Sequence, residues 1–335
     1  MTTAPTDICL TIDTEFSING AFAHPGGRRP LGEARVHCPV NGEDQGLGFL
    51  LHTLGDAGLR ATFFVETANI AYFGDRPMGG VVETLLRHDQ DVQLHLHPCW
   101  RIFEDPGWRE RVVNGPPSDQ SAAEPVEALC AMLDQGIAAF ARWGAPRPAA
   151  LRTGNLSAGP KVYQAMARCG LPLGSNVGFG YAPPTDPSLR LLGGVHPIGD
   201  VVEIPVLSYL QLKFGRWSKM RMLAINATSW PETKALLLAA RQAGVSPVVI
   251  ITHPFEFIKT PDGADRVNHI NQARFRKLCA FIADHPQQFR ATTFGADGER
   301  WRANAPTPSP TLQAPLGAVL GRMVTNALND RASFL

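Results

Sequence analysis

Buried β-strand runs that end in polar residues are the feature that most limits how this 335-residue chain can fold. Apolar, β-branched runs occupy residues 8–13, 60–65, 149–152 and 246–252, and stretches of helical periodicity lie between them. Strands that alternate with helices pair in parallel through right-handed crossovers, which buries the sheet on both faces. The sequence therefore predicts an α/β fold with helices around a parallel sheet.

Two histidines stand at the end of a further strand run, in the segment DVQLHLHPCW at residues 91–100. Residues two apart in a strand point to the same side, so His95 and His97 can converge on one point. Their apolar neighbours then face the packed layers: Val92, Leu94 and Leu96. Imidazole is a common ligand for zinc and related metals. An isolated pair also fits two hydrogen-bonded strand-end histidines, so a metal site requires further groups elsewhere in the chain.

Such groups follow other strands. Asp13 and Glu15, again two apart, come directly after the first strand. Because ligands and catalytic groups gather at the carboxyl edge of a parallel sheet, the two carboxylates are expected there. The planar guanidinium of Arg152 can orient Asp13, and His253, beside a proline, can act as a general acid. Taken singly, these residues also fit a solvated turn, a surface cation and a capped or buried histidine.

Composition excludes several classes of function. The chain has 31 basic and 30 acidic residues and a net charge of +1, so no global field draws it to nucleic acid or to an anionic membrane. The six cysteines form no CxxC pair, which is typical of reduced, buried thiols. No apolar stretch is long enough to span a bilayer, and the first residues run directly into a strand. We therefore expect a cytoplasmic protein.

The C-terminal part differs from the rest in composition. Residues 1–300 are expected to form one catalytic domain, and the proline-rich residues 301–315 a linker. Residues 316–335 then show the spacing of an amphipathic helix. Its apolar residues are Leu316, Val319, Leu320, Met323, Val324, Ala327 and Leu328. With only Arg322 and Arg331 as basic residues it lacks the cationic face of a membrane-surface helix, so we expect it to dock on the domain or on a second chain, as in a homo-oligomer.

Five stretches taken in order resemble the motifs of the polysaccharide deacetylases, the family with the NodB homology domain, which includes carbohydrate esterase family 4. They are TIDTE at 11–15, HLHP at 95–98, RTG at 152–154, VVEIPV at 201–206 and THPFE at 252–256. The resemblance spans residues 7–295. It implies a distorted (β/α) barrel of six to eight strands, a divalent metal, and hydrolysis of an N-acetyl group from a sugar. It also implies that Asp13 is the base, His253 the acid, and Arg152 the residue that holds the base.

The chain departs from the usual family pattern at the metal site. The base is usually followed directly by the metal carboxylate, but Thr14 stands there and Glu15 comes one residue later. The usual histidine spacing of four would lead from His95 to Cys99. We prefer His97, because strand geometry aims it with His95 and a neutral imidazole needs no deprotonation, but Cys99 stays a possible ligand. The predicted ligands are therefore Glu15, His95 and His97, for zinc or else cobalt, nickel or manganese.

The expected reaction follows from these roles. Asp13 deprotonates a water whose pKa the metal lowers, the metal also polarises the amide carbonyl, and His253 protonates the leaving amine. The expected substrate is an N-acetylated sugar on a nucleotide- or lipid-linked intermediate. Side chains on loops beside the site are expected to contact it: Trp100, Asn155 and Glu256. The alternatives are a metallohydrolase of cyclic amides or other small C–N substrates, and a non-catalytic carbohydrate- or partner-binding protein with a decayed site.

Overall fold

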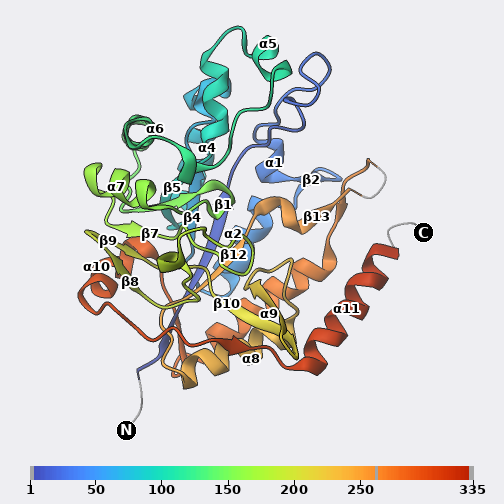
Figure 1. Cartoon of the computed structure of the whole chain (residues 1–335). Coiled ribbons are helices and arrows are strands. Elements are labelled where there is room, and N and C mark those ends of the chain that lie inside the picture. Colours follow the sequence, from blue (N-terminus) through green and yellow to red (C-terminus); the bar gives the residue numbers. More distant parts are fainter. Residues whose placement is uncertain (1–3, 261–262, 332–335) are drawn as a thin grey trace.

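A computed structural model describes residues 4–260 and 263–331 of the chain. The first three residues of the predicted domain and the last four of the predicted C-terminal helix lie outside the described residues. One curled sheet runs through the middle of the molecule, with helices packed around it (Figure 1). None of the described helices is long and apolar enough to cross a membrane.

Within the described residues the central sheet has nine strands. Eight follow the order β12-β1-β4-β5-β6-β7-β9-β8, and β15 pairs with the start of β1. All pairings are parallel except that of β8 with β9. The predicted parallel α/β sheet is confirmed. The strands are β1 (Thr6–Thr14), β4 (Thr62–Glu66), β5 (Asp91–Leu96), β6 (Ala150–Thr153), β7 (Leu173–Gly174), β8 (His196–Ile198), β9 (Val201–Glu203), β12 (Val248–Thr252) and β15 (Phe289–Ala291).

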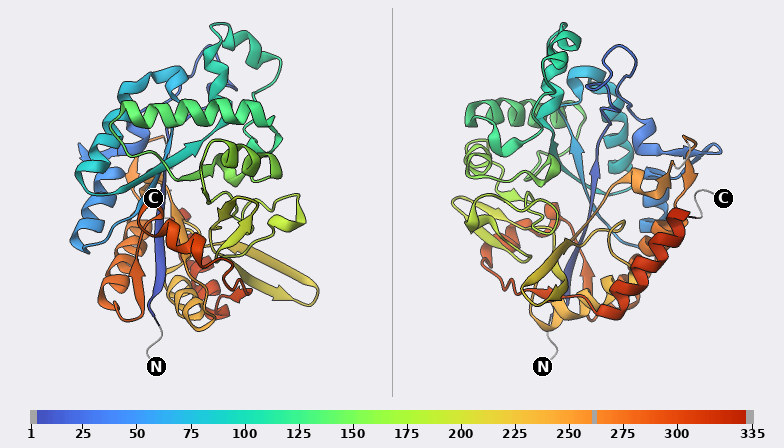
Figure 2. Two further views of the ribbon diagram at one scale, coloured as in Figure 1. Left: turned by 90° about the vertical axis from the view of Figure 1, so that its left-hand side faces the viewer. Right: turned by 45° about the vertical axis from the view of Figure 1, so that its right-hand side comes forward.

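Helices cover the outer face of the curled sheet (Figures 1 and 2). The longer ones are α2 (Leu47–Asp56), α4 (Asp75–Arg87), α6 (Val126–Arg142), α7 (Pro160–Arg168), α8 (Trp230–Gln242), α9 (His269–Asp284), α10 (Phe294–Ala303) and α11 (Leu316–Arg331). Short ones lie in the connections: α1 (Ala34–His37), α3 (Ile70–Phe73) and α5 (Trp108–Val113). Small two-stranded ribbons, β2 (Pro39–Val40) with β3 (Glu43–Asp44) and β13 (Ile258–Lys259) with β14 (Arg266–Val267), complete the connections.

The two ends of the sheet approach each other through single bridges. Pro205 follows β9 and cannot donate a ladder hydrogen bond, so the strand stops there. The next residue, Val206, nevertheless bridges Val249 of β12, and Ala224 bridges Ile251. The sheet is therefore a distorted barrel, as the resemblance implied, closed by isolated contacts in place of a continuous ladder.

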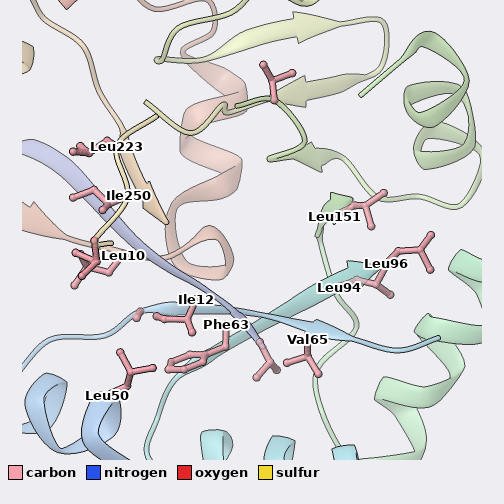
Figure 3. Close-up of a cluster of buried hydrophobic side chains, with 14 of the residues drawn as sticks. Leu10, Ile12, Leu50, Phe63, Val65, Leu94, Leu96, Leu151, Leu223 and Ile250 are labelled. Atoms are coloured by element: carbon pink, nitrogen blue, oxygen red, sulfur yellow. The ribbon is translucent and has the colours of Figure 1, made fainter. Parts of the chain in front are cut away.

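Alternation along each strand separates an outer core from a barrel interior. Outward residues pack against the helices in one large apolar cluster, of which Leu10, Phe63, Leu94 and Ile250 come from four adjacent strands (Figure 3). Inward residues belong to a second, smaller cluster that includes Cys9, Phe64, Val249 and Ile251. Toward the carboxyl ends of the strands the inward positions become polar: Thr11, Asp13, His95 and Arg152. Strand geometry therefore delivers the polar side chains to one end of the barrel.

The segment predicted to be a linker is packed on the barrel. The Thr307 amide donates to the Val195 carbonyl at 3.0 Å, and the Val195 amide donates to the Thr307 hydroxyl at 2.8 Å. The short strand β16 (Leu312–Gln313) then pairs in parallel with β10 (Ser208–Phe214). The prediction of a linker over residues 301–315 is therefore wrong, because composition cannot distinguish a solvated proline-rich chain from an extended one whose backbone is paired.

The C-terminal helix α11 docks on the same domain. Val319 is fully buried, and the buried Arg322 donates to Glu232 of α8 at 2.9 Å. Docking on a second chain is not needed to explain this contact. The side chains of residues 324–331, which include three of the predicted apolar positions, lie outside the description.

A hairpin that the sequence analysis did not predict stands out from the body of the molecule. Strand β10 pairs antiparallel with β11 (Trp217–Met222), with a register shift between Leu210 and Leu212. The hairpin is drawn in yellow and projects at one side in the left view of Figure 2. Its outer half is exposed on both faces, so no hydrophobic alternation marks it in the sequence.

Candidate active site

The polar inward residues meet in one cavity at the carboxyl ends of β1, β5 and β12. The cavity has a volume of about 570 Å³. It is lined by all five groups expected to act on a substrate or bind a metal: Asp13, Glu15, His95, His97 and His253. The chain thus brings together residues that are up to 240 positions apart, since Asp13 lies on β1 and His253 directly follows β12, which pairs with β1 in parallel.

Glu15 and the two histidines form a compact donor set. Glu15 Oε2 lies 2.7 Å from His97 Nε2 and 3.2 Å from His95 Nε2. The other ring nitrogens contact groups that only accept: His95 Nδ1 is 2.8 Å from the Arg152 carbonyl oxygen, and His97 Nδ1 is 2.7 Å from Asp119 Oδ2. Both Nδ1 atoms therefore donate, and Nε2 is the ring nitrogen directed at Glu15, where it can donate a proton to the carboxylate or, after losing that proton, offer a lone pair to a metal. Two oriented imidazoles and a carboxylate fit a divalent transition metal.

Gly154 explains part of the RTG motif. A Cβ at this position would lie 2.2 Å from His97 Nδ1, far inside contact distance. Glycine therefore lets the imidazole approach the backbone that follows β6. The motif supplies both the guanidinium of Arg152 and the space for His97.

Burial and charge shift the pKa values of the donor set in opposite directions. Burial alone would raise the pKa of Glu15, but the charge of His97 and hydrogen bonds from both histidines outweigh it and lower that pKa well below its usual value. Burial would likewise lower the pKa of His97, but the charge of Glu15 and the hydrogen bond to Asp119 outweigh it and raise that pKa. Glu15 is therefore ionised across the neutral range, as a metal ligand must be.

Cys99 belongs to a second potential donor group with His97 and Asp119, whose ligand atoms all lie within 4.8 Å of one another. Its thiol is buried and does not line the cavity. Burial raises the pKa of Cys99 far above its usual value, and the charge of Asp119 raises it further. Cys99 therefore fits the site less well than His97.

Arg152 holds Asp13 from inside the barrel. Its fully buried guanidinium donates from Nη1 to Asp13 Oδ1 at 2.6 Å and to the Thr11 hydroxyl at 2.9 Å. The Ser175 carbonyl and hydroxyl accept from Nε and Nη2 at 3.1 and 2.8 Å. The guanidinium carbon also lies 4.2 Å from the centre of the Phe64 ring. One oxygen of Asp13 is thus fixed, and the other, Oδ2, is on the side of His253.

His253 stands opposite Asp13, with Nε2 3.8 Å from Asp13 Oδ2. Its Nδ1 lies 2.9 Å from Glu256 Oε1, and Asn226 and Thr252 donate to the same carboxylate at 2.8 and 2.7 Å. Burial would lower the pKa of His253, but the hydrogen bond and charge of Glu256, with the charge of Asp13, outweigh it and raise the pKa to about 9. The ring is therefore protonated at neutral pH and carries a proton toward the cavity.

The three residues expected to contact substrate are placed differently. Trp100 is 2% exposed, packs 5.5 Å from the Phe103 ring centre and does not line the cavity, so its prediction is corrected. Glu256 lines the cavity, but both of its oxygens accept from protein groups, so it orients His253 and is not a free substrate ligand. Asn155 lines the cavity and donates to Asp119 at 2.7 Å, and its contact with substrate stays a prediction.

Sequence reasoning missed three polar residues beside the site. Asp119 lies in an irregular segment 22 residues after His97, and Asn226 lies beyond the hairpin, so neither carried a periodic signal. Glu66 is on β4, in register with His95 of β5. Burial raises the pKa of Glu66 to about 7 against the lowering effect of the two histidines, and its Oε2 has no hydrogen-bond partner among the described residues. Its place at the end of a predicted strand could have marked it.

Comparisons with known proteins support the fold. No protein-family model and no curated protein matches the sequence. Among solved structures, a candidate polysaccharide deacetylase from Mycobacterium smegmatis is similar over 94% of this chain and 99% of its own, with 16% identity and a TM-score of 0.55. A family 4 carbohydrate esterase from Streptomyces lividans is similar over 86% of this chain and 93% of its own, with 13% identity and a TM-score of 0.41. A peptidoglycan deacetylase from Bacillus subtilis is similar over 90% of this chain and 93% of its own, with 11% identity and a TM-score of 0.41.

The first of these matches carries the structural conclusion, since it extends over nearly the whole of both chains. Its low identity limits that conclusion to architecture. The chain has the fold of the polysaccharide deacetylases, as the order of its five motifs implied.

Proposed function

We propose that the protein is a metal-dependent hydrolase that removes an N-acetyl group from a sugar or glycan intermediate. The observation that carries the proposal is the pairing of Asp13 Oδ2 and His253 Nε2, 3.8 Å apart, in a cavity that also contains the donor set of Glu15, His95 and His97. A base and an acid beside three metal-ligand side chains form the group that hydrolysis of an amide requires.

The donor set determines what a metal would contribute. Glu15, His95 and His97 would hold a divalent ion, for which zinc is our first proposal and cobalt, nickel and manganese the alternatives. When bound, the ion supplies a positive charge that polarises the amide carbonyl. The orienting contacts of both histidines are present in the protein itself, so the site is preorganised.

The proton transfers belong to the opposing pair. Asp13 Oδ2 accepts a proton from the attacking water, while Arg152 holds the other carboxylate oxygen and keeps the group in place. His253 Nε2 donates its proton to the leaving amine, and Glu256 fixes the ring through Nδ1. The two roles are compatible at neutral pH because the pKa of His253 is raised to about 9.

Elemental analysis of the purified protein, combined with an acetate-release assay on N-acetylated sugars, tests this proposal. We expect about one divalent ion per chain and release of acetate. Bound metal with hydrolysis of cyclic amides but no acetate release would favour the small-substrate alternative. Protein that neither binds metal nor hydrolyses either class would indicate a binding protein with a decayed site.

The pH dependence of turnover tests His253. The pKa of His253 is raised to about 9, so the required imidazolium is present below that pH and the rate should fall as pH rises through about 9. His253→Ala should remove this fall in rate at high pH, the basic limb of the pH–rate profile, and should keep the bound metal. In Glu256→Gln the carboxylate that raises the pKa is gone, so the limb should move to lower pH. If the basic limb of the pH–rate profile is unchanged in both variants, the pKa that it reports belongs to another group.

Asp119 tests the orientation of His97. Removing the Nδ1 partner in Asp119→Ala should weaken metal affinity by about 10- to 100-fold, the usual effect of losing such an orienting contact. Titration with zinc in competition with a chelator measures the affinity. Asp119→Asn keeps an acceptor oxygen and should recover part of the loss. Cys99→Ser is the control and should bind as wild type; loss of metal in this control with full binding in His97→Ala would overturn the ligand assignment.

A further inference from the structure

The outer half of the β10–β11 hairpin differs from the rest of the described surface. Every residue from Lys213 to Lys219 is exposed, and the hairpin stands clear of the body (Figure 2). Phe214 is 85% exposed and Trp217 is 56% exposed, and the two residues are paired in register across the turn. Exposed apolar residues that occur singly are ordinary on a protein surface, but two large aromatic residues at one projecting tip mark a contact surface.

Positive charge surrounds this aromatic pair. The hairpin contains Lys213, Arg216, Lys219 and Arg221, and the chain has no acidic residue between Glu203 and Glu232. Within the part of the chain that the structure describes, the three cations of the outer half form no ion pair. A chain with a net charge of +1 thus gathers four cations in one hairpin. Uncompensated cations beside exposed aromatic rings are complementary to an anionic partner that also offers an apolar layer.

We propose that the tip of the β10–β11 hairpin docks on an anionic lipid surface. Phe214 and Trp217 enter the interface between headgroups and acyl chains, where aromatic side chains are favoured. Lys213, Arg216 and Lys219 lie against the headgroups, which attract basic residues over about a Debye length. An anionic bilayer provides both the charge and the apolar layer that this tip requires.

A glycan bound along the hairpin fits the tip less well. Sites for small ligands are concave, with polar groups that converge on the ligand. Here both faces of the hairpin are exposed from Lys213 to Ser218, and neither aromatic residue lines the cavity. A sugar ring stacked on Trp217 would therefore have no opposite wall. A lipid surface needs none, because it surrounds the inserted side chains.

Docking of the tip would also place the cavity relative to the lipid. The base of the same hairpin lines the cavity through Met220, Arg221 and Met222. Met222 lies five residue steps along the strand from Trp217, or about 16 Å at the usual rise. A sugar linked to a membrane-anchored carrier could reach a cavity held at that height. This last consequence rests on the proposed function, whereas docking itself does not.

Co-sedimentation of the full-length protein with vesicles tests the proposal. We expect binding to an equal mixture of phosphatidylcholine and phosphatidylserine, weaker binding as salt is raised, and little binding to phosphatidylcholine alone. The double variant Phe214→Ser/Trp217→Ser should lower the bound fraction at least about tenfold, because it removes the inserted side chains. Lys213→Gln/Arg216→Gln should weaken binding and reduce its dependence on salt.

The controls separate docking from folding and from catalysis. Val113, 76% exposed on α5, is a matched site, and Val113→Ser should bind vesicles as wild type does. The tip variants should keep the wild-type melting temperature, since the replaced side chains are exposed. Equal binding by wild type and the aromatic double variant, or no vesicle binding by wild type, would overturn the proposal. Binding of a soluble acidic oligosaccharide by the tip, without vesicle binding, would also overturn it. Loss of acetate release in the tip variants would bear on the proposed function alone and would leave the docking proposal as it is.

Discussion

Asp13→Asn should lower turnover by about 10²-fold or more while the metal stays bound. The substitution keeps the shape of the side chain and the oxygen that accepts from Arg152, but it removes the group that takes a proton from water. Glu15→Gln should instead lose both metal and turnover, because Glu15 Oε2 is the carboxylate atom between the two imidazoles. Metal content and steady-state rates of acetate release on the two variants measure the difference.

The same pair of variants can contradict the assigned roles. Loss of metal in Asp13→Asn with retention in Glu15→Gln would show that the two carboxylates have exchanged functions. Unchanged turnover in both variants would contradict the hydrolase proposal itself. Gln45, half-buried and outside the cavity, offers a control position, and Gln45→Ala should match wild type in both assays.

Arg152→Met should lower the free energy of unfolding by about 3–5 kcal/mol, one of the largest effects expected from a single substitution here. Arg152 is fully buried and Asp13 is 4% exposed, so the variant leaves a largely buried carboxylate without the cation that holds its inner oxygen. Urea denaturation followed by circular dichroism measures the change. The double variant Arg152→Met/Asp13→Asn should be more stable than Arg152→Met alone, because it removes the uncompensated charge as well.

An exposed ion pair provides the comparison. Arg142 donates to Asp75 at 2.6 Å, but the two side chains are 48% and 46% exposed. Arg142→Met should therefore cost at most about 1 kcal/mol. Similar losses in the two methionine variants would mean that burial of the Arg152–Asp13 pair contributes little.

The strands and the residues at their ends were predictable from the sequence for a simple reason. Buried parallel strands such as β1 and β12 are continuous apolar runs, and a strand directs alternate residues to one side. Asp13, Glu15, His95 and His97 could therefore be placed in one cavity before the structure was known. Asp119 could not, because the irregular segment around it acquires its position only by packing against the rest of the fold.

The other errors have similar causes. A loop aromatic such as Trp100 was expected near substrate, but it packs with Phe103 in the core of its own segment, which burial of apolar area favours. The hairpin was missed because an irregular register and solvent on both faces erase the period of two. The proline-rich segment after α10 was mistaken for a linker because backbone pairing leaves no compositional trace.

Strand β16 also covers a strand edge that would otherwise be open. In the order β11-β10-β16 it covers the second edge of β10, whose backbone groups at Tyr209 and Leu210 it pairs. A chain shortened at residue 303 would present that edge to solvent, and an open strand edge is a template for pairing with other copies. The residues that resemble a dispensable tail therefore close this edge, and a shortened protein designed for crystallisation should retain them.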